Sequence, residues 1–293
     1  MFLRQRFSIA TAALVITTTV IAASSFAAPA DRFAAVKITA HHVAGSIHML
    51  EGAGGNIGVS IGPDGTLIVD DQYAPLADKI ISALRGLNGD KPKLILNTHY
   101  HGDHTGSNPT VGETGTIISH ENVRIRLLDE EDFPRSGLPL VTFKENISVH
   151  FNNEDITILH LPAGHTDGDV IVWFQTSNVV HMGDHFFKDR YPYIDIAAGG
   201  SVDGFINNVE NVLAMLSPDT QIIPGHGSLS SVEDLADTIA GVKASVAQVR
   251  LGLTAGQSAE KIAAALDDTS PEMGSGFITA ARWVEIIQTD KNR

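Results

Sequence analysis

The chain has 293 residues, a formal net charge of −14, 43% hydrophobic and 18% charged residues, and no cysteine. This composition is typical of a globular protein, and the lack of cysteine excludes disulfides, thiol nucleophiles and cysteine-based zinc sites. Acidic residues outnumber basic ones by 34 to 20, which argues against nucleic acid as a partner, because a protein that binds phosphates needs a basic face.

Residues 1–28 have the pattern of an export signal peptide. Arg4 and Arg6 form a cationic start, an apolar stretch follows at 9–23, and small residues that suit cleavage lie at 25–30. A membrane anchor is the alternative, although the apolar stretch is shorter than the roughly 20 residues that a spanning helix needs. We therefore expect a periplasmic or secreted protein without stable membrane association after signal cleavage. A single domain is expected over residues 31–293.

Strand and helix patterns alternate along the rest of the chain in two similar cycles. The first cycle has three strands joined by Gly-rich or Pro-Asp-Gly turns, a helix and a buried strand, at residues 47–50, 57–61, 67–69, 74–87 and 94–96. The second cycle has four strands, a helix and a strand, at residues 147–151, 156–161, 170–174, 179–182, about 203–216 and 222–223. The chain after about residue 230 is mostly helical. Two strand-rich halves, each closed by helices, indicate two packed β-sheets with helices on both outer faces.

The strand at 94–96 leads into a loop that contains His99, His101, Asp103 and His104. Core packing does not explain this cluster, because His and Asp are rarely buried without partners. A metal ion is the natural partner. In an extended loop His99 and His101 point the same way and can hold one ion, while the turn at Gly102 directs Asp103 and His104 to a neighbouring position.

Four ligands are too few for two closed metal sites, so further donors should come from loops that are distant in sequence. Three candidates follow the ends of apolar strands, each directly after a glycine: His165, Asp184 and His226. Loops at strand ends commonly carry functional residues. We expect one site built from four strand ends.

The chain resembles the metallo-β-lactamase superfamily in the motif His-x-His-x-Asp-His at 99–104 and in the later His, Asp and His, over about residues 43–226. The resemblance implies an α/β fold, a four-layer αβ/βα sandwich of two mixed β-sheets, with two metals in a groove at one edge. It assigns three ligands to each metal and makes Asp184 either a bridge or a ligand of the second metal. The first metal takes His99, His101 and His165, and the second takes Asp103, His104 and His226.

Asp184 lies where the familiar zinc β-lactamases usually have a cysteine, whereas lactonases and glyoxalase II-like thioesterases of the superfamily use Asp. A ligand set of nitrogen and oxygen atoms suits zinc and tolerates iron or manganese better than a thiolate would. We expect two Zn²⁺ ions per chain, with iron or manganese as alternatives.

The resemblance implies a zinc-dependent hydrolase in which Asp103 orients a hydroxide, held by the two metals, for attack on the carbonyl of a cyclic amide or ester. The leading expectation is β-lactam hydrolysis, with a role in antibiotic resistance, because an exported, cysteine-free chain of this length looks like a zinc β-lactamase. A lactone or thioester hydrolase is the alternative. An iron-dependent oxidoreductase and a non-catalytic metal-binding protein are further alternatives. The expected partner is a small-molecule substrate, and the oligomeric state is left open.

Several other residues are candidates for substrate contact or for support of the ligands. Lys188 lies near the position where zinc β-lactamases place a lysine that binds the substrate carboxylate, with a solvated surface role as the alternative. His185 adjoins a predicted ligand, and Tyr191 or Tyr193 could donate to an oxyanion, although packing explains all three. Asp70, at the end of the strand at 67–69, resembles a carboxylate that orients the metal loop, with a turn cap as the alternative.

Export predicts a shortened mature protein outside the cytoplasm, with its new N-terminus between about Ala28 and Asp31. Cell fractionation followed by N-terminal sequencing measures both properties. An intact N-terminus recovered in the membrane fraction would indicate an anchor instead.

Overall fold

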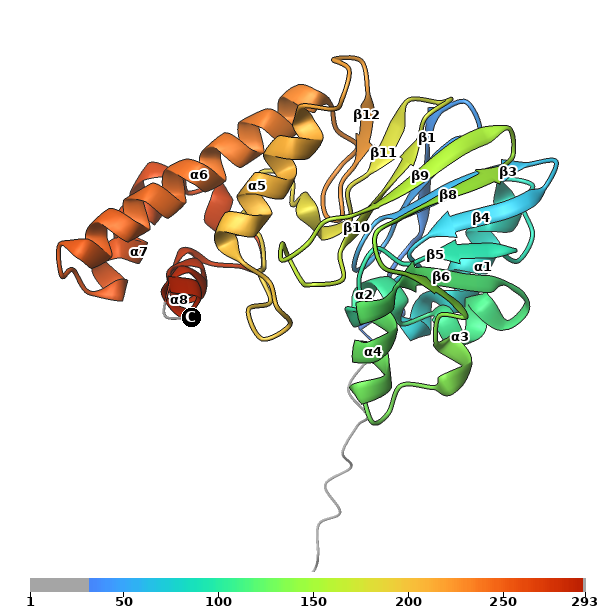
Figure 1. Ribbon diagram of the computed structural model, residues 1–293, viewed down its shortest axis with the longest axis horizontal. Coiled ribbons are helices and arrows are strands. Elements are labelled where there is room, and N and C mark those ends of the chain that lie inside the picture. Colours follow the sequence, from blue (N-terminus) through green and yellow to red (C-terminus); the bar gives the residue numbers. More distant parts are fainter. Residues whose placement is uncertain (1–31, 292–293) are drawn as a thin grey trace, which may run out of the picture.

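The computed structural model describes residues 32–291, and the expected signal peptide lies outside this part. The described strands form two sheets (Figure 1). The seven-stranded sheet has the order β1 (Thr39–Ala44), β2 (Ile47–Glu51), β3 (Ile57–Gly62), β4 (Gly65–Val69), β5 (Leu94–Leu96), β6 (Thr116–His120) and β7 (Val141–Phe143). The five-stranded sheet has the order β12 (Gln221–Ile223), β11 (Val179–His181), β10 (Val170–Phe174), β9 (Glu154–His160) and β8 (Asn146–Phe151).

Each half of the chain contributes helices as well as strands. In the first half they are α1 (Ala77–Gly86), α2 (Gly102–Thr105), α3 (Asn108–Val111) and α4 (Glu121–Asp129). In the second half they are α5 (Val202–Leu213), α6 (Val232–Thr254), α7 (Ala259–Thr269) and α8 (Ala280–Lys291).

The alternation of side chains along each strand creates the layers. In β4, Leu67 and Val69 face the apolar core between the two sheets, whereas Ile68 faces the core under α1. In β10, Val172 lies in the core between the sheets, and Ile171 packs with α5 and α6 on the other side. Successive strand residues point to opposite faces, so both sheets bury apolar residues on both sides.

Helices cover the outer faces of both sheets. α1 buries Ala77, Ile80, Ile81 and Leu84, which have the helical spacing that the sequence predicted. Helices α5 to α8 lie beyond the five-stranded sheet, on the left in Figure 1. The expected four-layer sandwich of two mixed sheets is therefore confirmed.

Several short elements were not predicted from the sequence: β1, β6, β7 and helices α2 to α4. The strand β7 is three residues long and partly exposed, so its pattern resembles that of a loop. Helices α2 and α3 have four residues each, which is too short for a helical period to show. The longest missed element, α4, has nine residues and buries only Val123 and Leu127, so its helical period is weak. Tertiary packing contributes more than local sequence to the stability of such short helices.

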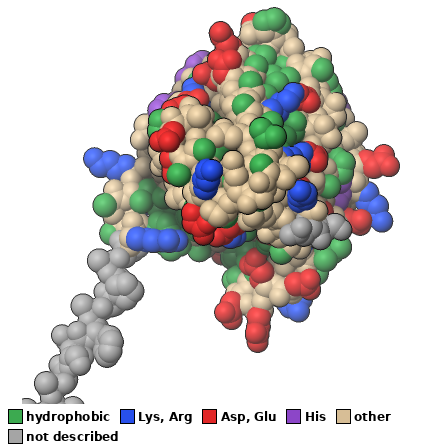
Figure 2. All heavy atoms as spheres, turned by 90° about the vertical axis from the view of Figure 1, so that its left-hand side faces the viewer, with side chains coloured by type: hydrophobic (Ala, Val, Ile, Leu, Met, Phe, Trp, Pro, Cys, Tyr) green, Lys and Arg blue, Asp and Glu red, His purple; other side chains and the backbone are tan. Residues whose placement is uncertain are grey.

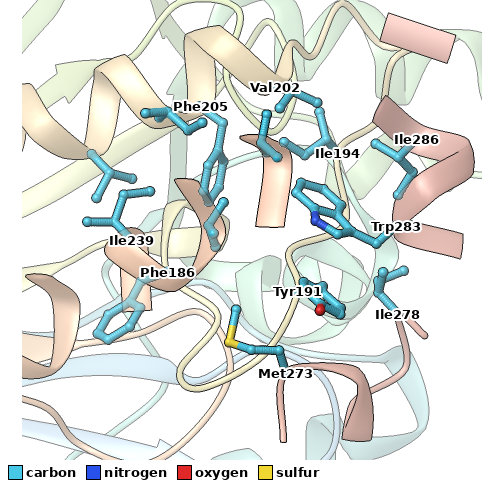
Figure 3. Packing of buried hydrophobic residues seen from close by; sticks show 14 of the residues in the cluster. Phe186, Tyr191, Ile194, Val202, Phe205, Ile239, Met273, Ile278, Trp283 and Ile286 are labelled. Atoms are coloured by element: carbon cyan, nitrogen blue, oxygen red, sulfur yellow. The ribbon is translucent and has the colours of Figure 1, made fainter. Parts of the chain in front are cut away.

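The last three helices share one apolar core with the five-stranded sheet. Trp283 of α8 is fully buried, stacks on Tyr191 and donates a hydrogen bond from its indole nitrogen to Ser245 Oγ at 2.9 Å (Figure 3). On the face that these helices present, acidic and basic side chains are interspersed with apolar and neutral ones (Figure 2). No helix within residues 32–291 is long and apolar enough to cross a membrane.

Replacement of Trp283 by alanine should lower the free energy of unfolding by about 3–5 kcal/mol, because it removes a large buried side chain and leaves a cavity. Denaturant unfolding of the protein measures this loss. The control is Met215→Ala, since Met215 is 46% exposed and its truncation should change stability by less than about 0.5 kcal/mol. Equal stability of the two variants would show that the C-terminal helices are not anchored through Trp283.

Candidate metal centre

The predicted ligands meet because several strands end at the same edge of the two sheets. β4 and β5 are parallel neighbours in the seven-stranded sheet. In the other sheet β11 and β12 are parallel, and β9 runs in the same direction because both β9 and β11 are antiparallel to β10. The loops that follow these strands therefore lie together, and they contain all seven predicted metal ligands.

The first group of ligand atoms comes from four residues: His99, His101, His165 and Asp184. These atoms all lie within 4.8 Å of one another. Asp184 Oδ2 is 3.7 Å from His99 Nε2 and 3.4 Å from His165 Nε2. His101 faces the group with its Nδ1, which lies 2.9 Å from His165 Nε2.

The second group consists of Asp103, His104 and His226, again within 4.8 Å. The other oxygen of Asp184 points here: Asp184 Oδ1 is 3.1 Å from His104 Nε2 and 3.3 Å from His226 Nε2. Asp103 Oδ2 lies 3.5 Å from His226 Nε2 and 3.8 Å from His104 Nε2. One carboxylate, Asp184, thus stands between the two groups.

The donor atoms of these groups fit metal ions. His99 Nε2, His104 Nε2 and Asp184 Oδ1 are buried, and none of them makes a hydrogen bond of normal geometry among the described residues, although His104 Nε2 and Asp184 Oδ1 lie 3.1 Å apart. An unpaired buried polar atom costs about 1–3 kcal/mol, so three in one place require an explanation. A cation in each group would satisfy them all, and imidazole with carboxylate is a donor set that suits zinc and is also compatible with iron or manganese.

The surroundings hold the side chains of the first group in the forms that bind metal. Burial and the nearby His104 keep the pKa of His99 well below its usual range, and burial lowers the pKa of His165 to about 3. Both imidazoles are therefore neutral. Burial alone would raise the pKa of Asp184, but His104, His226 and His99 outweigh it and hold that pKa well below its usual range.

The carboxylates around His104 favour its protonated form. Burial opposes this charge, but the carboxylates of Asp184, Asp103 and Asp70 outweigh it and raise the pKa of His104 well above its usual value. The protonated imidazole offsets part of the negative charge at the site. A metal cation would take over that role, because imidazole must lose its proton to become a ligand.

Asp70 lies where the sequence placed it, behind the metal loop. Its carboxylate accepts hydrogen bonds from the backbone N and the hydroxyl of Thr98, both at 2.7 Å, and lies 2.7 Å from His104 Nδ1. The Thr98 hydroxyl lies 3.0 Å from His99 Nδ1 in turn. Asp70 therefore orients two of the seven candidate ligands, as expected of a carboxylate behind metal-binding histidines.

Asp195 has the same role for His101, and the sequence analysis did not find it. Asp195 Oδ2 lies 3.1 Å from His101 Nε2 and accepts a hydrogen bond from the Tyr100 hydroxyl at 2.7 Å. Burial alone would raise the pKa of Asp195, but these hydrogen bonds outweigh it and hold the pKa well below its usual range. Asp195 belongs to the loop between β11 and α5, and no motif marks it because only the folded loop brings it to the site.

The short loop between β2 and β3 supports the site from the other side. A side chain at Gly55 would place its Cβ 2.1 Å from His104 Cε1, so the position must be glycine for the imidazole to fit. The amide of Asn56 donates hydrogen bonds to two carbonyls of the loop 224–227, at 2.9 and 2.8 Å. Asn56 thereby holds the loop that carries His226, and the sequence analysis missed it as well.

A groove of about 540 Å³ opens over the two groups. Among the described residues it is lined by candidate ligands, glycines and three aromatic side chains, and it contains no Lys or Arg: Gly54, Tyr73, His101, Gly102, Asp103, Asp184, Tyr193, His226 and Phe277.

Lys188 does not enter this groove. Its backbone N donates to the carbonyl of His226 at 2.9 Å, but its side chain turns toward the start of α6, where Nζ lies 3.2 Å from Asp234 Oδ1. The sequence placed Lys188 close to a ligand, but the direction of its side chain follows from the acidic partner on α6.

His185 and Tyr191 also lie away from the groove. The short turn at 183–185 directs the buried ring of His185 to the opposite side of the chain, where it stacks on Phe205 at 5.4 Å. Tyr191 is 1% exposed and stacks on Trp283. The tyrosine of this segment that lines the groove is Tyr193.

Two known proteins resemble this chain in sequence. The chain is 22% identical over 173 residues to metallo-beta-lactamase type 2 of Bacteroides fragilis, and the aligned segment covers 59% of this chain and 67% of that protein. It is 28% identical over 168 residues to hydroxyacylglutathione hydrolase GloC of Haemophilus influenzae, and the aligned segment covers 53% of this chain and 78% of that protein.

Solved structures share the fold. A metallo-beta-lactamase from Pontibacter korlensis superimposes with a TM-score of 0.62 at 14% identity, over 71% of this chain and 99% of that one. DIM-1 metallo-beta-lactamase does so with a TM-score of 0.61 at 19% identity, again over 71% of this chain and 99% of that one. The family model of the metallo-beta-lactamase superfamily matches residues 50–226, the segment that contains every candidate ligand. The chain belongs to the metallo-β-lactamase superfamily.

Proposed function

We propose that this chain is a hydrolase that binds two divalent metal ions, preferably zinc, and cleaves the bond between the carbonyl carbon and the heteroatom of a cyclic ester or amide or of a thioester. The observation that carries this proposal is the position of Asp184, with one carboxylate oxygen toward each group of ligand atoms. Bound metal would supply a water that is nucleophilic at neutral pH and would polarise the substrate carbonyl.

Asp103 is the candidate for positioning the attacking water. Its carboxylate is 20% exposed and lines the groove, whereas the carboxylate of Asp184 is 5% exposed and enclosed by histidines. In hydrolysis the water oxygen bonds to the carbonyl carbon, the carbon–heteroatom bond breaks, and a water proton ends on the departing heteroatom. Asp103 can accept a hydrogen bond from the water and fix the direction of attack.

Tyr193 is the candidate for stabilising the oxyanion. Its ring centroid lies 5.7 Å from that of His101 and 5.8 Å from that of His165, on the wall of the groove. Burial and the nearby Asp195 raise the pKa of Tyr193, so the phenol keeps its proton at neutral pH. A protonated phenol beside the reacting carbonyl can donate to the charge that develops on oxygen.

The groove favours a neutral substrate over the β-lactam that ranked first in the sequence analysis. A β-lactam antibiotic carries a carboxylate, and its recognition calls for a local cation in a protein of charge −14. The lysine proposed for that role, Lys188, is paired with Asp234 instead. The groove therefore supports hydrolysis of a lactone or thioester better than hydrolysis of a β-lactam. A role in antibiotic resistance would require lactam hydrolysis.

We also propose that the enzyme acts in the periplasm or after secretion. This proposal depends on the signal pattern at residues 1–28.

Metal analysis together with a substrate screen tests the function. Elemental analysis of the metal-replete mature protein should give two ions per chain, and the zinc-loaded protein should hydrolyse at least one of a lactone, a thioester and a nitrocefin-type lactam. Chelation should abolish that activity, and added zinc should restore it. One ion or none per chain, or activity that survives complete chelation, would contradict the proposal.

Asp103→Asn should reduce turnover on the best substrate of that screen by orders of magnitude, because the amide is a poor ligand and cannot take up the proton of the water. Thermal unfolding of the metal-free protein should change little, since Asp103 is partly exposed. The control is Asp189→Asn, a change at an exposed position outside the groove, which should keep normal turnover. Retention of most activity by Asp103→Asn would show that another group positions the water.

A further inference from the structure

The wall of the groove beside His226 is formed by Phe277, which comes from the segment between α7 and α8. Its ring centroid lies 5.9 Å from that of His226 and 5.9 Å from that of the buried Phe187. Phe277 is nevertheless 59% exposed. It stands outside the part of the chain that matches the family model, residues 50–226, so it is a feature of this chain's own C-terminal helices.

The residues around Phe277 in sequence fix its position. Met273 and Ile278, on either side of it, are buried in the core that also contains Trp283 and Tyr191 (Figure 3). The backbone N of Tyr191 donates to the carbonyl of Met273 at 2.9 Å. The exposed phenyl group therefore sits on an anchored segment, and its place at the groove does not depend on a loose loop.

Single exposed apolar residues are common on protein surfaces and need no explanation by themselves. Leu251 on α6 is one of these, with 72% exposure. Phe277 differs because it shares a groove with two other aromatic side chains, Tyr73 and Tyr193, and with candidate metal ligands. An apolar wall next to reactive groups is the usual composition of a site for a small molecule.

Three cations near the groove, Lys188, Arg190 and Arg32, are not among the residues that line it. Lys188 pairs with Asp234, and Arg190 donates from Nε to the carbonyl of Lys188 at 3.1 Å. Arg32 stacks on the ring of Tyr73, with its guanidinium carbon 5.2 Å from the ring centroid, and is not among the residues that line the groove. Among the described residues no cation lines the groove. The part of a substrate that extends beyond the reacting carbonyl would therefore meet mainly apolar side chains.

We propose that Phe277, with Tyr73 and Tyr193, binds an uncharged apolar substituent of the substrate, so that the enzyme prefers neutral lactones or esters with a long alkyl or an aromatic group. This inference rests on the proposed hydrolase function. Phe277 is a specificity-determining residue in this arrangement: it contacts the substituent and leaves the reacting carbonyl to the residues around the metal groups.

The test is a series of neutral lactones that differ only in the length of an unbranched alkyl substituent. For the parent enzyme kcat/KM should rise about threefold to fourfold per added methylene until the wall is covered. Phe277→Ala should flatten this series, with about tenfold loss for the longest lactone and less than about twofold for the shortest, chiefly through KM. Phe277→Leu should restore most of the dependence, and Leu251→Ala should match the parent.

A binding measurement separates this inference from the proposed function. Calorimetry with metal-stripped protein should show that the longest lactone binds the parent more tightly than it binds Phe277→Ala. The two proteins should have the same thermal unfolding temperature. Chain-length-dependent binding that needs Phe277, in a protein that hydrolyses none of the substrates, would uphold the apolar wall and overturn the hydrolase. Two results would overturn the role of Phe277 but not the hydrolase function. One is the same dependence of kcat/KM on chain length in the parent and in Phe277→Ala, and the other is a loss of kcat/KM in Phe277→Ala that is equal for all lactones.

Discussion

The buried carboxylate of Asp70 connects the end of β4 to the loop that carries the first candidate ligands. Three contacts of 2.7 Å, to the backbone and hydroxyl of Thr98 and to His104, surround it. An unpaired carboxylate at this depth would cost several kcal/mol, so the loop must take the conformation that satisfies it. The orientation of His104, and through Thr98 that of His99, therefore depends on a carboxylate that the protein itself supplies.

The ligands could be predicted from the sequence because each one follows an apolar strand, and strand direction decides where it ends. All seven candidate ligands come together at one edge in two groups, and Asp184 directs one carboxylate oxygen toward each group. The long strands and helices were predictable for a similar reason, since their apolar periods are visible locally. Of the missed elements, α2, α3 and β7 have only three or four residues, and β1, with six, has no fully buried side chain, so these segments show no clear apolar period.

Side-chain direction within loops was the part that the sequence could not supply. His185 is next to a ligand yet faces away from it, because the turn at 183–185 rotates it toward Phe205. Asp195 and Phe277 reach the site from segments with no motif, and only the packing of the loop after β11 and of the C-terminal helices brings them there. Proximity in sequence to a ligand is a poor guide to contact with substrate when the intervening backbone turns.

The two ligand groups have a mechanical consequence, because each takes residues from both halves of the chain. His99 and His101 come from a loop of the seven-stranded sheet and His165 from the five-stranded one, and His104 and His226 are divided in the same way. An ion held at either place would cross-link the sheets at this edge and close a long loop, as a disulfide does in other proteins. In a chain without cysteine, bound metal would add this restraint to the hydrogen bonds that already join the sheets here, such as those from Asn56 to the loop 224–227.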